Sequence, residues 1–208
     1  MQKLLDGIRD FHHRVRPGYR ERFAHLALGQ SPDCLFVACA DSRVVPNLFA
    51  STDPGDLFVI RNVGNIVPRH DAGDGAAGAG VEFATISLGV RDIVVCGHSS
   101  CGAMQALADG VVPPGAPNLD RWLSHARDSL SRLQAEDRID PALDPVDRLS
   151  QAHVLQQLDH LRGYTPVAER LALGTIRLHG WWFDLHHAEV QAYDAERGCF
   201  RPLVDQLG

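Results

Sequence analysis

The sequence predicts a single α/β domain built on parallel strands, and three observations support this prediction. Short apolar runs rich in β-branched residues end abruptly in Gly, Ser or Asp, as buried parallel strands do, and the clearest are residues 34–39 and 93–96. Segments with helical spacing of apolar residues alternate with these runs. A chain of 208 residues with 45% hydrophobic content can also bury one sizeable core.

The first 30 residues precede the sheet. Apolar residues recur at roughly helical spacing from residue 3 to 28, and Pro17-Gly18 interrupts them, so we expect two amphipathic helices broken at this dipeptide. Arginines on these helices are interleaved with acidic residues. This pattern is more typical of a solvated face or a contact with a partner subunit than of a membrane or nucleic-acid surface. Residues 29–32 then turn the chain into the first strand.

Two further strands are predicted at residues 57–60 and 93–96. A short helix over residues 44–50 follows the first strand, and a helix over residues 81–88 leads to the third. The glycine-rich stretch 71–80 lacks the arrangement of a dinucleotide-binding turn or a phosphate loop. We interpret it as a flexible lead to the following helix and predict no nucleotide site.

The second half of the chain is mostly helical before its last strands. The expected helices are residues 103–108, 119–134, 146–161 and 165–174, followed by a strand at 175–178 and a terminal hairpin of 189–193 and 199–203. His179 follows the predicted strand, and we interpret it as a packed histidine at a strand end rather than a site residue.

Charge, hydropathy and cysteine number narrow the classes of function. The net charge of -6 comes without a basic face, so nothing supports nucleic-acid binding. No apolar run approaches membrane-spanning length, and the amphipathic start does not resemble a signal peptide. Five cysteines are too few for a disulfide scaffold, and in a reducing compartment they are metal-binding or inert. We therefore expect a soluble cytoplasmic protein with no nucleic-acid or membrane partner.

Three side chains of metal-ligand type lie where predicted strands end. Cys39 closes the first strand, and His98 and Cys101 follow the third, so all three should meet at the carboxyl edge of the sheet. Each residue alone is more often a buried core residue, but two thiols and an imidazole together suit zinc. Structural zinc sites close with four protein ligands and catalytic ones keep a position for water. The count here is three, with Asp41 as a possible fourth.

The segment after Cys101 adds to this prediction. A helix is expected to begin immediately beyond Cys101, so that its positive end faces the sulfur. Such a position lowers the pKa of a thiol and favours the thiolate that binds a metal.

Five motifs occur in an order that is specific to one family. They are CADSRVVP at 39–46, GDLFVIRNVGNIVP at 55–68, VEFA at 81–84, VCGHSSCGAM at 95–104 and LHGWWFD at 178–184. Together they resemble the β-class carbonic anhydrases, and most closely the plant-like branch that includes bacterial enzymes linked to cyanate metabolism. The resemblance covers nearly the whole chain, including GQSP at 29–32.

The resemblance implies a four-stranded parallel sheet extended by an antiparallel strand and flanked by helices. It implies an N-terminal helical arm of residues 1–30 that packs on a neighbouring subunit, and a zinc-binding core over residues 31–208. One zinc per subunit would be held by Cys39, His98 and Cys101, with Asp41 and Arg43 as a catalytic dyad. The implied reaction is the reversible hydration of carbon dioxide to bicarbonate and a proton by a zinc-bound hydroxide, the activity of the zinc lyase carbonate dehydratase.

The resemblance also implies a shared substrate pocket, because in the family the homodimer is the active unit and higher homo-oligomers occur. Gln30, Phe58 and Phe83 would line the pocket of the partner's zinc. Gln30 would donate a hydrogen bond to the forming bicarbonate, and the two aromatic rings would supply an apolar wall for carbon dioxide. Phe83 departs from the family pattern, since many plant-like members have tyrosine there. Two alternatives stay open: a hydrolase of carbon disulfide or carbonyl sulfide on the same fold, and a non-catalytic zinc domain.

Overall fold

The structure is a computed structural model that describes residues 1–72, 75–136 and 139–207. Its centre is one six-stranded sheet with the order β2-β1-β3-β4-β5-β6. The strands are β1 (Cys34–Cys39), β2 (Leu57–Asn62), β3 (Asp92–His98), β4 (Arg177–Asp184), β5 (Glu189–Asp194) and β6 (Cys199–Pro202). The first four pair in parallel, and β5 and β6 continue the sheet in antiparallel pairing. The predicted single α/β domain is confirmed, with an extension of two antiparallel strands rather than one.

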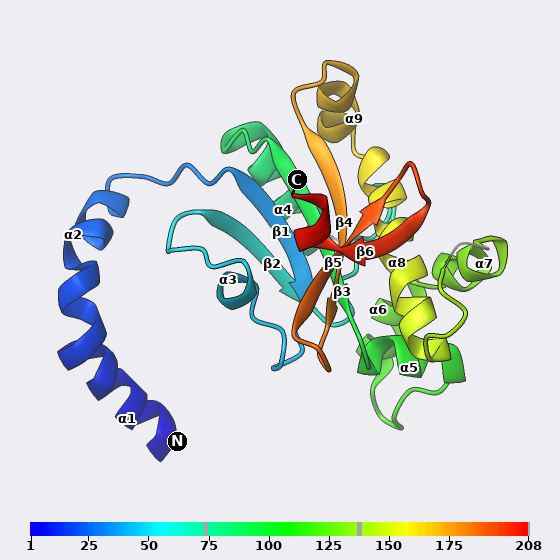
Figure 1. Cartoon of the computed structure of the whole chain (residues 1–208), viewed down its shortest axis with the longest axis horizontal. Coiled ribbons are helices and arrows are strands. Elements are labelled where there is room, and N and C mark those ends of the chain that lie inside the picture. The colour runs from blue at the N-terminus through cyan, green and yellow to red at the C-terminus, as the bar shows by residue number, and fades with distance from the viewer. Residues whose placement is uncertain (73–74, 137–138, 208) are drawn as a thin grey trace.

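Helices cover the sheet on both faces (Figure 1). The helices that follow the first strand are α3 (Pro46–Phe49), α4 (Gly75–Glu82) with the π-helical turn η2 (Phe83–Ser87), α5 (Gly102–Asp109), α6 (Pro117–Ser124), α7 (Asp128–Ala135), α8 (Pro145–Arg162), α9 (Thr165–Ala172) and the short 3-10 helix η3 (Leu203–Gln206). Alternate residues of β1 point to two separate cores. Leu35 and Val37 pack with residues of α4, α8 and α9, whereas Phe36 and Ala38 pack with residues of α3 and β5.

Parallel pairing brings the ends of β1 and β3 to the same edge of the sheet. Residues 34–38 of β1 pair in register with residues 92–96 of β3. Gly97 then allows α8 to approach the end of β3, because a Cβ atom at Gly97 would lie only 2.7 Å from Cγ2 of Val154. Helix α8 therefore lies directly against the loop that follows β3.

The N-terminal arm differs from the prediction. Helix α1 (Gln2–Asp10), the π-helical turn η1 (Phe11–Val15) and α2 (Arg16–Leu26) follow one another without a break, so the predicted interruption at Pro17-Gly18 is wrong. The π turn ends at Val15, and Pro17 is the second residue of α2. In a regular α-helix a proline ring clashes with the carbonyl four residues earlier, and here that carbonyl belongs to His13 in the π turn.

The arm extends away from the sheet (Figure 1). No residue of α1, η1 or α2, all of which the structure describes, is buried. Arg22, near the C-terminal end of the arm, forms ion pairs with Asp53 at 3.0 Å and Asp56 at 2.9 Å, in the turn before β2. Whether the arm packs on a neighbouring subunit stays a prediction.

Three smaller predictions also need correction. The helix expected over residues 119–134 is in fact two helices, α6 and α7. The turn between them contains the buried Ala126, and α7 packs on α8. Residues 75–80 are helical rather than flexible, and their glycines permit close packing, since a Cβ at Gly80 would lie 2.5 Å from Cδ1 of Ile60. Residues 73–74 of that stretch lie outside the described residues. His179 lies within β4, where Nε2 is 2.7 Å from Asp92.

Membrane insertion through a helix finds no support. Within the described ranges, no helix combines the length and the apolar composition that crossing a bilayer requires.

Candidate metal centre

Cys39, His98 and Cys101 converge at the carboxyl edge of the sheet, as predicted. One ligand atom from each residue lies within 4.8 Å of the others, and all three residues are buried. Cys39 is the last residue of β1, His98 is the last residue of β3, and Cys101 immediately precedes α5. Among the described residues this is the one group of His, Cys, Asp and Glu side chains with such spacing.

The histidine of this cluster leaves a nitrogen free for a metal. Nδ1 of His98 lies 2.9 Å from the carbonyl oxygen of Ser99. A carbonyl oxygen only accepts, so Nδ1 carries the proton and Nε2 keeps its lone pair. Nε2 is buried and has no hydrogen-bond partner among the described residues. A buried, unpartnered imidazole nitrogen beside two sulfur atoms fits the ligand set that zinc prefers.

The surroundings of the two sulfur atoms favour negative charge. The pKa of Cys39 is lowered mainly by a hydrogen bond from the Cys101 thiol, which outweighs the effect of burial, and further by the main-chain N–H groups of Asp41 and Gly64. Those two N–H groups lie 3.4 Å and 3.3 Å from Sγ of Cys39. The hydrogen bond with Cys39, together with burial, raises the pKa of Cys101.

Helix α5 acts in the direction that the sequence predicted. The N–H groups of Ala103 and Met104, in its first turn, face the sulfur of Cys101 and act to lower the pKa of this thiol. Both sulfurs therefore have main-chain donors that would stabilise a thiolate, which is the form that binds zinc.

His153, a buried histidine that the sequence did not mark as functional, supports Cys39 indirectly through the peptide of Gly64. Gly64 has φ +81°, a conformation that glycine adopts freely, and its N–H points at the Cys39 sulfur. The carbonyl of Gly64 accepts a hydrogen bond from Nε2 of His153 at 2.9 Å. Nδ1 of His153 lies 2.8 Å from Oγ of Ser129. Burial lowers the pKa of His153 to about 4, so the ring is neutral and holds the Gly64 peptide in place.

Asp41 and Arg43 form a tightly held pair next to the cluster. Nε and Nη2 of Arg43 donate to Oδ1 and Oδ2 of Asp41 at 3.0 Å and 2.8 Å, and the Arg43 main-chain N–H adds a third hydrogen bond at 2.9 Å. The Arg43 guanidinium is the main cause of a pKa for Asp41 far below its usual range. Oδ2 of this carboxylate lies 4.0 Å from Nε2 of His98. An ionised carboxylate is thus fixed beside the candidate metal ligands.

Arg61 fixes the same strand end from the main-chain side. It donates from Nε to the carbonyl of Cys39 at 3.1 Å and from Nη2 to the carbonyl of Asp41 at 2.7 Å. Strand β2 ends at Asn62, which pairs with Cys39 at the same edge of the sheet.

The three predicted pocket residues lie away from the metal ligands of their own chain. Phe58 pairs with Leu35 near the beginning of the parallel strands, whereas the ligands follow the opposite ends. The rings of Phe58 and Phe83 are 5.7 Å apart, and Phe83 is 46% exposed. Gln30 is exposed just before β1. Their predicted place in a partner's pocket stays a prediction.

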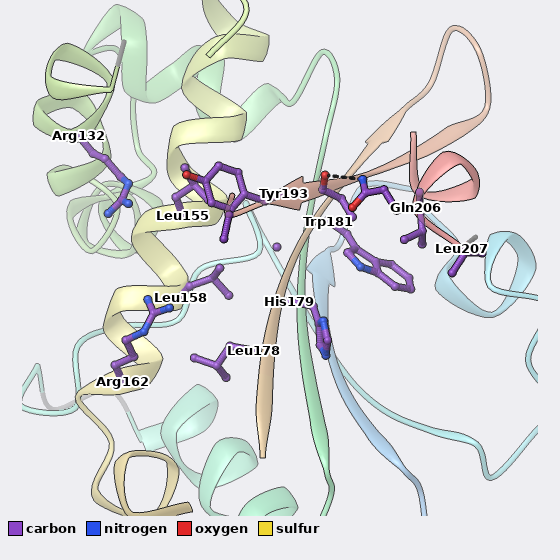
Figure 2. A pocket seen from close by; sticks show the side chains of 14 residues that line it. Arg132, Leu155, Leu158, Arg162, Leu178, His179, Trp181, Tyr193, Gln206 and Leu207 are labelled. Atoms are coloured by element: carbon purple, nitrogen blue, oxygen red, sulfur yellow. Dashed lines mark hydrogen bonds between the residues drawn. The ribbon is translucent and has the colours of Figure 1, made fainter. Parts of the chain in front are cut away.

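A separate cavity of about 660 Å³ lies between α8, β4 and β5 (Figure 2). Leu155, Leu158 and Leu178 form apolar wall, and Arg162 lies at the α8 side. None of the candidate ligands lines it, nor do Asp41 and Arg43. The candidate metal ligands and the Asp41–Arg43 pair therefore lie at the sheet edge, outside this cavity.

Comparisons with known proteins agree with this geometry. The family model described as carbonic anhydrase matches residues 34–190. The carbonic anhydrase of Pseudomonas aeruginosa is 40% identical, and the match covers 99% of this chain and 93% of that protein. The solved structure of the β-carbonic anhydrase CcaA has a TM-score of 0.90 and 36% identity, covering 97% of this chain and 98% of the other.

A second group of solved structures is more distant in sequence. One of the tetrameric β-carbonic anhydrases from the filamentous ascomycete Sordaria macrospora has a TM-score of 0.80 and 28% identity, covering 96% of this chain and 98% of the other. The family match, the shared fold and the convergent Cys-His-Cys cluster together show that this chain belongs to the β-carbonic anhydrases, enzymes whose general reaction is the hydration of carbon dioxide.

Proposed function

We propose that this protein catalyses the reversible hydration of carbon dioxide to bicarbonate and a proton in a zinc-dependent reaction. One observation carries the proposal. The Asp41 carboxylate is held ionised by Arg43, with Oδ2 4.0 Å from the unpartnered Nε2 of His98. A purely structural metal site does not require a hydrogen-bond acceptor, such as the Asp41 carboxylate, that a separate arginine holds in place beside the ligands.

Cys39, His98 and Cys101 would hold one zinc ion per subunit. When bound, zinc lowers the pKa of a water ligand and so supplies a nucleophilic hydroxide near neutral pH. The main-chain donors around both sulfurs and the free Nε2 of His98 support this assignment.

Asp41 would orient the nucleophile. Because it is ionised, its carboxylate can only accept hydrogen bonds, so it accepts from the attacking O–H and directs the oxygen lone pair at the carbon of carbon dioxide. Arg43 fixes the plane of that carboxylate by donating to both oxygens, which a lysine could not do in the same geometry.

The substrate pocket would be completed by a second subunit. Carbon dioxide is small and apolar, so it needs a dry apolar wall beside the nucleophile. The rings of Phe58 and Phe83, 5.7 Å apart, would provide this wall in the partner's site. Gln30 would donate its amide N–H to an oxygen of the forming bicarbonate. The homodimer would then be the active unit, alone or within a larger homo-oligomer.

We also place the protein in the cytoplasm. All five cysteines lie in the described residues and all are free thiols, which suits a reducing compartment.

Stopped-flow measurement of carbon dioxide hydration by the zinc-loaded protein tests the proposal. Wild type should accelerate hydration, and Asp41→Asn should lose most of the activity while it keeps its zinc. Asp33→Asn is a matched control, because Asp33 also pairs with an arginine, Arg91, but does so at the opposite end of β1. No hydration by fully zinc-loaded wild type would favour the non-catalytic alternative. Faster turnover of carbon disulfide or carbonyl sulfide than of carbon dioxide would favour the hydrolase.

A further inference from the structure

The loop between His98, at the end of β3, and Cys101, before α5, is held by one face of α8. Oγ of Ser150 donates to the carbonyl of His98 at 2.9 Å. Oδ1 of Asp147 accepts from the main-chain N–H of Ser100 at 2.6 Å. Residues 147 and 150 are three apart, so both side chains lie on the same face of the helix. The first turns of α8 thus hold this loop at two points.

Ser100 has an unusual backbone conformation. Its φ is +53°, in the left-handed region that residues other than glycine rarely adopt. This conformation turns the Ser100 N–H towards Asp147 and leaves its carbonyl on the other side of the residue. The short hydrogen bond to Asp147 is therefore a contact that keeps the Ser100 backbone in this orientation.

The carbonyl of Ser100 reaches the catalytic pair. It accepts a hydrogen bond from Nη2 of Arg43 at 3.1 Å. The same nitrogen donates to Oδ2 of Asp41 at 2.8 Å. One residue, Ser100, therefore contacts Asp147 through its N–H and Arg43 through its carbonyl.

We propose that Asp147 is a positioning residue for the Arg43–Asp41 pair, acting through the backbone of Ser100. By accepting the Ser100 N–H it keeps the Ser100 carbonyl where Nη2 of Arg43 needs it, and Arg43 then holds the Asp41 carboxylate in its working orientation. Within the described residues, the Asp147 side chain has no hydrogen bond to a candidate ligand, to Asp41 or to Arg43, and it accepts instead from the Ser100 N–H. The inference rests on the proposed function only in treating Asp41 and Arg43 as the catalytic dyad.

A purely structural role for Asp147 makes different predictions. An acidic side chain in the first turn of a helix stabilises that helix through its charge, wherever its oxygen atoms point. Positioning depends instead on an acceptor atom at the right place, whatever its charge. Asp147→Asn keeps the acceptor and removes the charge, whereas Asp147→Glu keeps the charge and moves the acceptor by one methylene group.

The test compares Asp147→Ala, Asp147→Asn and Asp147→Glu as zinc-loaded full-length proteins, with thermal unfolding as a check of the fold. Asp144→Ala is the matched control, since Asp144 lies at the N-terminal cap of α8 and makes no capping hydrogen bond. We expect kcat/KM for carbon dioxide to fall about ten-fold or more in the Ala and Glu variants, as misplaced catalytic groups cause. The Asn variant and the control should keep most of the wild-type activity.

A second readout does not depend on turnover. The NMR signal of the Arg43 Nε–H reports the hydrogen bond to Asp41, which is 3.0 Å long in the structure. Its exchange with water should become faster in the Ala and Glu variants and stay as in wild type in the Asn variant and the control.

Two results would overturn the proposal. One is an unchanged Arg43 signal in the folded Glu variant, and the other is an Asn variant that loses as much as the Ala variant. If wild type itself showed no hydration of carbon dioxide, the proposed function would fail, but the Arg43 signal would still decide whether Asp147 positions the pair.

Discussion

Arg43 binds both carboxylate oxygens of Asp41, through Nε at 3.0 Å and Nη2 at 2.8 Å. The arginine side chain is 51% exposed and the aspartate side chain 18%, so the pair lies at the opening of the site rather than in the core. Ion pairs this exposed contribute little to folding. The two parallel hydrogen bonds fix the plane and rotation of the carboxylate, and their value is therefore orientation rather than stability.

Removing the guanidinium tests this view. In Arg43→Ala the Asp41 carboxylate is free to turn towards the metal and to compete with water for it, so we expect hydration of carbon dioxide to fall about 100-fold. The double change Asp41→Ala with Arg43→Ala removes the competitor, so the single variant should be at least as inactive as the double. Stopped-flow rates and zinc content of both singles and the double measure this.

The control for that series is Arg91→Ala, because Arg91 forms an exposed pair with Asp33 at 2.6 Å away from the site. Its activity should match wild type, and all variants should keep their zinc. An Arg43→Ala enzyme close to wild-type activity would mean that the pair has no catalytic role.

The three candidate ligands make a sharper prediction about metal content. Replacing Cys39, His98 or Cys101 by alanine removes a buried donor from a site that has three, so each variant should lose most of its zinc and its activity. Cys34→Ala is the control, since Cys34 begins β1 at the opposite end from the site. Elemental analysis decides the matter, and full zinc in all three ligand variants would refute the assignment.

His153 should make the protein sensitive to moderate acid. Burial lowers its pKa from 6.5 to about 4, so below pH 6.5 the unfolded chain takes up a proton that the folded protein resists. The contribution of His153 to the free energy of unfolding is therefore fully present above pH 6.5. It is lost as the pH drops towards 4, by up to roughly 3 kcal/mol.

The variant His153→Gln lacks this titration, and urea unfolding measures the difference. Comparing the slope of the unfolding free energy against pH in the two proteins cancels the contribution of other groups. We expect a shallower slope in the variant. Equal slopes would show that His153 is not held neutral in the folded protein.

The ligands could be predicted from the sequence because a local signal fixes each one. Cys39 ends an apolar run, and His98 and Cys101 follow another, and the carboxyl ends of parallel strands necessarily meet. Nothing comparable marks Asp147 or His153. Helical spacing shows that α8 has a buried face, but it does not show that this face contacts residues some 50 to 90 positions earlier.

The N-terminal arm was mispredicted for a similar reason. Pro17-Gly18 has the composition of a helix break, and the sequence carries no signal for the π turn that precedes the proline in a continuous helical arm. The division between α6 and α7 likewise depends on tertiary contacts. Trp122 donates to the carbonyl of Val63 at 2.7 Å, and the following turn buries Ala126.

The exposed arm provides the last prediction. Leu4, Ile8 and Phe11 recur at helical spacing, and they are 65%, 65% and 44% exposed. A helical arm that buries none of its residues and exposes such an apolar stripe is marginal in water unless something covers the stripe. We predict that a second copy of the chain covers it. Leu4→Ser with Ile8→Ser should remove roughly 4 kcal/mol of buried apolar contact and weaken the dimer about 1,000-fold.

Sedimentation at a series of concentrations measures this dimer, with Arg9→Ser as a control because Arg9 pairs with Asp6 on the polar side of the helix. If Gln30, Phe58 and Phe83 complete the partner's site, the monomeric variant should keep its zinc but lose most hydration of carbon dioxide. Raising the protein concentration should then restore both the dimer and the activity per subunit, because the lost contact only weakens association. A variant that stays dimeric and fully active at concentrations where wild type is dimeric would show that the arm does not build the active unit.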